Sequence, residues 1–285
     1  MPKDLAKNYY VSKNVANIHI VPQEISEVGS QAIYGTPIEI LKEQNNWFFV
    51  QTPDQYQGWV LKDCVIAKNC SYPKTSISAK VKSLWTHIQY VEDTTPHPPI
   101  ITLPFETKIE VISSKEELYN RWIKVLLING KIGFAQSRDF VFNFDFKILS
   151  IDEMIDLSKA FLNLPYYWGG NSSFGYDCSG FTQMLYRQMG VNIFKDSFNQ
   201  AIDPNLEEVK LKDLQKGDLV FFSSNKIIVT HVGMYVSDGK IIHSSAGGKT
   251  SQPKIQITKI SSHKAIGGIN MENVVSARRK ACQMQ

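Results

Sequence analysis

A cysteine at the expected start of a helix is the residue of this 285-residue chain best suited to chemistry. After Cys178, apolar residues recur at helical spacing up to Met189, and Gly190 is a residue type that commonly follows a helix end. The preceding loop, residues 169–175, is rich in glycine and serine, which suits a backbone that a substrate approaches closely. The unpaired N–H groups and positive dipole of a helix start lower a cysteine pKa and stabilise an oxyanion. We therefore expect Cys178 to act as a nucleophile.

Two histidines follow on a predicted β-hairpin. Strands are predicted at residues 229–236 and 240–244, with a turn at 237–239 between them. On adjacent antiparallel strands the two histidines can face the same side, so we expect His231 to take the thiol proton and His243 to orient it. A structural cysteine with structural histidines is the alternative, and the order of the motifs favours catalysis. A thiolate–imidazolium pair titrates as one unit, so activity should fall on both the acid and the alkaline side.

The segment from about Ser150 to Gly268 resembles the NlpC family of papain-like cell-wall peptidases. The resemblance rests on four motifs: Pro165 to Gly170, Asp177 to Phe181, Thr230 to Tyr235, and Ile242 to Ser244. It implies an α+β papain-like domain in which the helix carrying the cysteine packs on an antiparallel sheet. It also implies attack on an isopeptide or peptide bond of peptidoglycan stems, through an acyl-enzyme that water hydrolyses and without a cofactor.

The same resemblance assigns substrate contacts within this segment. Tyr166 would lie beside the oxyanion, Trp168 would wall the pocket, Asp177 would meet a substrate amine, and Ser179 and Ser197 would bind the α-carboxylate of D-glutamate. Two of these residues have structural alternatives: Ser179 could satisfy first-turn backbone donors, and Trp168 could belong to the core.

The first half of the chain contains an internal repeat of alternating strand patterns. Trp47 precedes Gly58 by 11 residues, and Trp122 precedes Gly133 by 11 residues. The pattern resembles two bacterial SH3-like domains, which implies two small all-β barrels before the catalytic domain. The expected domains are residues 1–72 and 73–145 for the two barrels and 146–285 for the peptidase.

In NlpC-type enzymes with paired SH3-like domains, the first barrel closes one end of the cleft and admits stem peptides with a free N-terminal L-alanine. An acidic residue and a tyrosine of that barrel help bind the ammonium, and Gln31 and Tyr56 match them by motif position. Gln31 carries no charge, so Asp177 would have to supply it. Lys195 stands where the family usually has arginine, and a lysine makes no bidentate contact.

Composition narrows the function classes. The net charge is +4, from 31 basic and 27 acidic residues, with no basic cluster typical of nucleic-acid binding. The four cysteines, Cys64, Cys70, Cys178 and Cys282, lack the spacing of a zinc site.

There is no 18-residue apolar run, so no membrane partner is expected. The first residues do not resemble a signal peptide, so we expect a cytoplasmic protein, or a periplasmic one if a native signal was removed. The tail from Met271 to Gln285 is expected to be a short helix or a frayed end.

The resulting prediction is a cysteine peptidase that cuts the γ-D-glutamyl–diamino acid bond of peptidoglycan stem peptides with a free N-terminal L-alanine. The diamino acid is diaminopimelate or lysine, and the role is murein peptide recycling or wall hydrolysis. A non-catalytic wall-binding protein, or an acyltransferase or amidase on the same scaffold, is the alternative.

Overall fold

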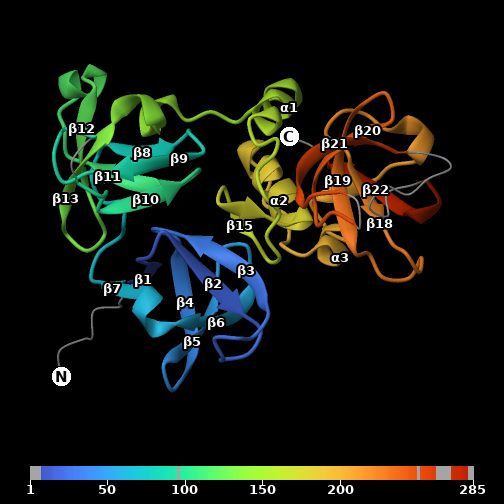
Figure 1. Ribbon diagram of the computed structural model, residues 1–285, viewed down its shortest axis with the longest axis horizontal. Helices are drawn as coiled ribbons and strands as arrows, with labels where there is room; N and C mark the ends of the chain where they lie inside the picture. The colour runs from blue at the N-terminus through green and yellow to red at the C-terminus, as the bar shows by residue number, and fades with distance from the viewer. Residues whose placement is uncertain (1–7, 95–96, 249–250, 261–270, 282–285) are drawn as a thin grey trace. The chain divides into compact units, whose positions relative to one another are not determined.

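The computed structural model describes residues 8–94, 97–248, 251–260 and 271–281. The chain divides into two compact units, Met1–Lys147 and Ile148–Gln285 (Figure 1). The first unit is built from strands and short turns of 3₁₀ helix, and the second combines helices with one large sheet. Within the described residues, no helix is long and apolar enough to cross a membrane.

The first seven strands form one antiparallel sheet in the order β3-β2-β6-β5-β4-β1-β7. Its core is made of small and branched apolar side chains such as Val11, Ile18 and Val50, each 1% exposed. The strands are β1 (Asn8–Val11), β2 (Val15–His19), β3 (Val28–Ile33), β4 (Pro37–Gln44), β5 (Trp47–Gln51), β6 (Gln57–Leu61) and β7 (Val65–Lys68).

The next seven strands form a five-stranded sheet, β13-β12-β11-β8-β14, and the hairpin β9–β10. A bridge between Gln89 and Phe134 connects the end of the hairpin to β13. The strands are β8 (Ser78–Val81), β9 (Trp85–Ile88), β10 (Ile101–Pro104), β11 (Lys108–Val111), β12 (Trp122–Leu126), β13 (Ile132–Gln136) and β14 (Phe140–Phe142).

The sequence repeat corresponds to the same close contact in both sets of strands. In each set the tryptophan begins one strand, β5 or β12, and the glycine lies on its antiparallel neighbour, β6 or β13. A Cβ atom on Gly58 would overlap a methyl group of Ile18, and one on Gly133 would overlap the equivalent methyl group of Ile88. The repeat is therefore confirmed, and its glycines are required because a neighbouring side chain fills the space of a Cβ atom.

The second unit contains a six-stranded antiparallel sheet in the order β17-β22-β18-β19-β20-β21, and its central helix packs against β19 and β20 (Figure 1). Its elements are α1 (Ile151–Lys159), β15 (Asn171–Ser172), β16 (Gly175–Tyr176), α2 (Cys178–Gln188), α3 (Ser197–Gln200), β17 (Leu206–Glu208), β18 (Leu219–Phe222), β19 (His231–Ser237), β20 (Lys240–Ser245), β21 (Lys254–Lys259) and β22 (Val274–Lys280).

Helix α2 has the boundaries that the sequence predicts. Asp177 is its N-cap and accepts a hydrogen bond from the Gly180 N–H at 2.6 Å. Gly190 follows its end with φ +74°, a left-handed conformation that glycine adopts without strain. Every residue of α2 except Arg187 is buried, and the Phe181 ring packs against other buried aromatic rings. The helix that carries the cysteine is therefore the centre of the second unit's core.

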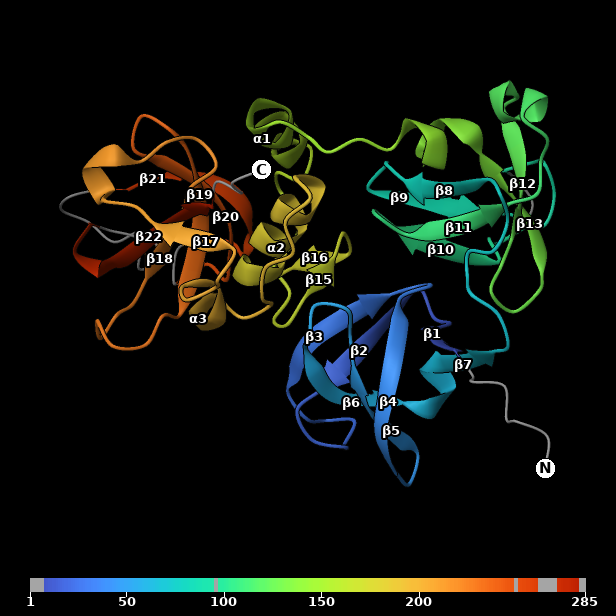
Figure 2. The same cartoon turned by 180° about the vertical axis from the view of Figure 1, so that it is seen from behind.

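The expectation of a short helix or frayed end from Met271 to Gln285 holds for the 3₁₀ turn Met271–Asn273 and was wrong for the residues that follow it up to Lys280. Residues Val274–Lys280 form β22, which pairs with both β17 and β18 inside the sheet (Figure 2). Ala277 is buried against the core at 1% exposure, while Arg279 forms a two-pronged ion pair with Asp218, with both N–O distances 2.8 Å. Cys282 lies outside the described residues.

Candidate active site

Two glycines bring the loop and the helix start together. The Asp177 N–H donates to the carbonyl oxygen of Gly170 at 3.0 Å, which anchors the loop one residue before the cysteine. A Cβ atom on Gly180 would overlap that same carbonyl oxygen. Glycine at position 180 therefore allows this close backbone contact, and a Cβ atom on Gly170 would overlap the carbonyl oxygen of Gly175.

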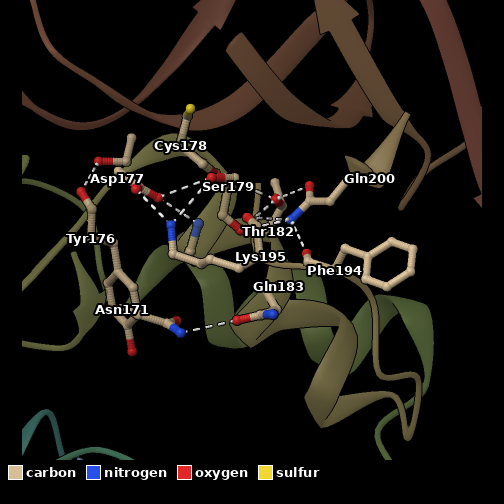
Figure 3. Close-up of polar contacts among 12 residues, drawn as sticks. Asn171, Tyr176, Asp177, Cys178, Ser179, Thr182, Gln183, Phe194, Lys195 and Gln200 are labelled. Atoms are coloured by element: carbon tan, nitrogen blue, oxygen red, sulfur yellow. Dashed lines mark hydrogen bonds and ion pairs between the residues drawn. The ribbon is translucent and has the colours of Figure 1, made fainter. Parts of the chain in front are cut away.

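Cys178 is the first residue of α2 and is 8% exposed. Its side chain points away from the polar groups around Asp177 and toward the sheet (Figure 3). The backbone N–H of Val232, the neighbour of His231 on β19, faces the thiol. Burial raises the pKa of the thiol to about 12, and the Asp177 carboxylate adds to the rise. The Val232 N–H, the Lys195 ammonium and the Ser179 N–H act in the opposite direction, in decreasing order.

The two histidines are joined in a hydrogen-bonded chain that ends at a threonine. Nε2 of His231 lies 2.9 Å from Nδ1 of His243, and Nε2 of His243 lies 2.9 Å from Oγ1 of Thr258. The chain has two proton arrangements, since each ring can donate in either direction. When His243 donates to Thr258 and accepts from His231, Nδ1 of His231 keeps its lone pair and can act as a base.

Burial keeps both imidazoles neutral. It lowers the pKa of His231 to about 4, and burial together with the neighbouring His231 lowers the pKa of His243 well below its ordinary value. These shifts favour a neutral thiol beside a neutral imidazole, which differs from the thiolate–imidazolium pair expected from the sequence. The reason is that the thiol and the imidazole are both buried, and burial disfavours the thiolate and the imidazolium. The thiolate would then form as the proton moves to His231 during attack.

Asp177 and Ser179 lie in a buried ionic cluster with Lys195. The Lys195 ammonium lies 2.7 Å from Oδ2 of Asp177 and 3.4 Å from the Ser179 hydroxyl (Figure 3). The Ser179 hydroxyl donates to Oδ1 of Asp177 at 3.2 Å. Both residues predicted to bind substrate thus have partners within the chain, and the Asp177 charge is already balanced by Lys195.

The other residues predicted to bind substrate in this unit lie at its surface or close to the thiol. Tyr166 is half-buried, and burial, Cys178 and Asp177 all raise the pKa of its hydroxyl. Trp168 is 62% exposed, so the alternative that it belongs to the core was wrong. Ser197 begins the short helix α3 and is half-buried.

Gln31 and Tyr56 belong to the first unit. Gln31 lies on β3, and its amide donates to Oδ1 of Asn17 at 2.9 Å. Tyr56 precedes β6, and its hydroxyl fills the space that a Cβ atom on Gly29 would need.

Sequence reasoning missed two residues that support the site. Thr258 lies on β21, which no motif indicated, and nothing near it in the sequence links it to a histidine. Gln200 ends the short helix α3, and its amide donates to the carbonyl oxygens of Ser179 and Phe194, each at 2.9 Å (Figure 3). It therefore ties the Lys195 segment to the first turn of α2.

Comparison with known proteins identifies the family. The model of the NlpC/P60 family matches residues 163–266, and that of the bacterial dipeptidyl-peptidase Sh3 domain matches residues 21–64. The γ-D-glutamyl-L-lysine dipeptidyl-peptidase of Bacillus cereus is 31% identical over 232 residues, which cover 77% of this chain and 68% of that protein. The chain belongs to the NlpC/P60 family. The resemblance noted in the sequence is confirmed, and the NlpC/P60 chain is a cysteine peptidase of the peptidoglycan hydrolase class.

Two further comparisons cover nearly the whole chain of this NlpC/P60 peptidase. Dipeptidyl-peptidase 6 of Lysinibacillus sphaericus is 28% identical over 261 residues, 85% of this chain and 89% of that protein. The crystal structure of an NlpC/P60 family protein from Bacillus cereus superposes with a TM-score of 0.77 over 96% of this chain and 99% of that chain, at 24% identity. The fold is thus an NlpC/P60 catalytic domain after a β-rich SH3 region.

Proposed function

We propose that this peptidase hydrolyses the γ-D-glutamyl–diamino acid bond of stem peptides with a free N-terminal L-alanine, and releases L-Ala-D-Glu. The observation that carries the proposal is the position of Cys178, at the start of a buried helix and facing the strand that bears His231. Two of the relatives, from Bacillus cereus and Bacillus subtilis, are named γ-D-glutamyl-L-lysine dipeptidyl-peptidases, which supports this bond as the substrate. The third residue of the peptide would be lysine or diaminopimelate.

The reaction follows from the contacts around the thiol. Sγ of Cys178 attacks the γ-carbonyl carbon of D-glutamate while its proton passes to Nδ1 of His231. The helix-start N–H groups, with the Tyr166 hydroxyl, stabilise the oxyanion. The protonated His231 then gives its proton to the leaving amine of the diamino acid, and the C–N bond breaks. Water deprotonated by His231 attacks the thioester, and Cys178 leaves as the thiol. His243 and Thr258 hold the His231 ring throughout.

The N-terminal strands would limit which peptides enter. We propose two SH3-like barrels at residues 1–72 and 73–145, followed by a papain-like peptidase at 146–285, because the tryptophan–glycine repeat occurs once in each set of strands. Gln31 and Tyr56 of the first barrel would bind the peptide N-terminus by hydrogen bonds, because Lys195 already balances the Asp177 charge. Use of free peptides would make this a recycling enzyme of the cytoplasm, which fractionation of cells tests.

Mass spectrometry of products tests the proposal. The substrates are L-Ala-γ-D-Glu-diaminopimelate, its lysine counterpart and the N-acetylated form of each, incubated with the wild-type protein and with Cys178→Ala. We expect L-Ala-D-Glu from the free-amine peptides and none from Cys178→Ala. Cleavage of the acetylated peptides would refute the free-amine requirement. Absence of cleavage, together with sedimentation on intact sacculi, would favour a wall-binding protein, and products joined to an added amine would favour an acyltransferase.

A further inference from the structure

A buried ion pair lies directly behind the candidate nucleophile. The side chains of Lys195 and Asp177 are 1% and 11% exposed, and Nζ lies 2.7 Å from Oδ2. Two charges removed from water this far persist only when they compensate each other. Asp177 also adjoins Cys178 in sequence and caps its helix, so the pair bears on the residue that would carry the chemistry.

The two oxygens of Asp177 have different partners. Oδ1 accepts from the Gly180 N–H at 2.6 Å and from the Ser179 hydroxyl at 3.2 Å, so it holds the first turn of α2. Among the hydrogen bonds of the described residues, Oδ2 accepts one, from the charged ammonium of Lys195. Asp177 therefore caps the helix with one oxygen and forms its ion pair with the other, and Lys195 provides the balancing positive charge.

Lys195 is itself held in place. Its carbonyl oxygen and that of Phe194 accept hydrogen bonds from the Gln200 amide at 3.3 and 2.9 Å, and the same amide donates to the Ser179 carbonyl oxygen. The Phe194 N–H donates to Asp203 at 2.8 Å. The ammonium thus reaches Asp177 from a segment tied to the same helix turn, and its position does not depend on a flexible surface side chain.

We propose that Lys195 is a positioning residue of the catalytic centre: by pairing with Asp177 it fixes the first turn of α2 and screens the carboxylate from the thiolate that Cys178 forms. The inference rests on the proposed function for the role of Cys178. The charged and titratable groups that act on that thiol are Asp177, Lys195 and Tyr166, and from β19 the Val232 N–H faces it, next in sequence to His231. Asp177 opposes thiolate formation and Lys195 favours it, so loss of the lysine alone leaves an uncompensated anion beside the thiol.

Alkylation of Cys178 by iodoacetamide tests this without any substrate. Mass spectrometry of the peptide that carries Cys178 separates it from the other cysteines. Below its pKa a thiol reacts in proportion to its thiolate fraction, so a rise of one pKa unit slows alkylation about tenfold at fixed pH. We expect Lys195→Met to slow alkylation at pH 8 about tenfold or more, and Lys195→Arg to restore most of the rate.

A second variant keeps the test valid if Lys195→Met folds poorly. Asp177→Asn with Lys195→Met removes both charges and keeps a side-chain oxygen at the cap, and we expect its alkylation rate to return toward the wild-type value. Lys216→Met is the matched control, because Lys216 pairs at 2.8 Å with Asp152 at an exposed site of the same unit. It should leave alkylation unchanged.

The outcomes separate the two proposals. Slower cleavage by Lys195→Met with unchanged alkylation, or a double variant as slow as the single one, would overturn the screening role. Absence of stem-peptide cleavage by the wild-type protein, with the alkylation changes as expected, would instead refute the proposed function and leave the role of Lys195 intact.

Discussion

Cys178 lies between two buried polar groups of opposite character. On the sheet side, the chain of His231, His243 and Thr258 is uncharged, because burial lowers both imidazole pKa values. On the helix side, Asp177 and Lys195 are charged and paired. The site therefore uses separate groups for proton transfer and for charge balance. A proton acceptor must be able to change its charge, whereas a fixed ion pair must not.

The largest effect should come from breaking the uncharged side. His231→Ala removes the general base and the acid for the leaving amine, so kcat should fall by about 10³- to 10⁴-fold. The free energy of unfolding should fall by far less than in a variant that leaves a buried charge unpaired, because His231→Ala removes an uncharged group. Initial rates of stem-peptide cleavage and urea denaturation measure the two quantities. His87→Ala, at an exposed position of the first unit, is the control and should retain full activity.

Breaking the charged side should lower stability as well as activity. Lys195→Met leaves the Asp177 carboxylate buried and unpaired, which typically costs about 3–5 kcal/mol. Lys216→Met breaks an ion pair whose side chains are 54% and 77% exposed, and exposed pairs contribute about 0–1 kcal/mol. Urea denaturation of the two variants compares them directly. Equal losses would mean that burial does not distinguish these pairs.

The pH profile should show that the uncharged side stays neutral. His231 must be unprotonated to accept the thiol proton, and its pKa is lowered from the ordinary 6.5 to about 4. The rate should therefore hold as the pH falls through 6 and decline only as it approaches 4. The rate constant kcat/KM, measured between pH 3.5 and 9, gives the acid midpoint. A midpoint near 6.5 would indicate an ordinary solvated histidine.

The smallest effect should come from the end of the histidine chain. Thr258→Val keeps the shape of the side chain but removes the hydroxyl that contacts Nε2 of His243, so kcat should fall only a few-fold, roughly the loss of one neutral hydrogen bond. Thr102→Val is the matched control, since Oγ1 of Thr102 lies 2.8 Å from Nδ1 of the exposed His87 in the first unit. A loss as large as that of His231→Ala would mean that the threonine sets the proton arrangement by itself.

Local sequence signals predicted the parts of this molecule that local physics determines. Asp177 before Cys178 and Gly190 after the helix set the ends of α2, and a turn joins the strands of the two histidines. The tryptophan–glycine repeat was visible because each glycine meets the same kind of neighbour. The family could be recognised because its motifs are short stretches of consecutive residues, such as Asp177 to Phe181 and Thr230 to Tyr235.

The remaining features depend on contacts between distant segments. The prediction for the tail failed because the partners of β22 lie far away in sequence: β17 and β18 pair with it, and Asp218 binds Arg279. Thr258 meets His243 through strand pairing, and Lys195 meets Asp177 because Gln200 of α3 holds its segment against the first turn of α2. The neutral state of the thiol and imidazole depends on burial, which no motif records.

The position of β22 has a consequence for the order of events during synthesis. A nascent chain that has been translated as far as β21 already contains Cys178, His231 and His243, yet β18 still lacks its neighbour on one side. That neighbour is supplied by Val274–Lys280, the last strand of the sheet in chain order. The N-terminal strands can fold while translation continues, but the peptidase sheet closes only after residue 280 has left the ribosome. Closure of that sheet therefore comes only after all three candidate catalytic residues have been synthesised.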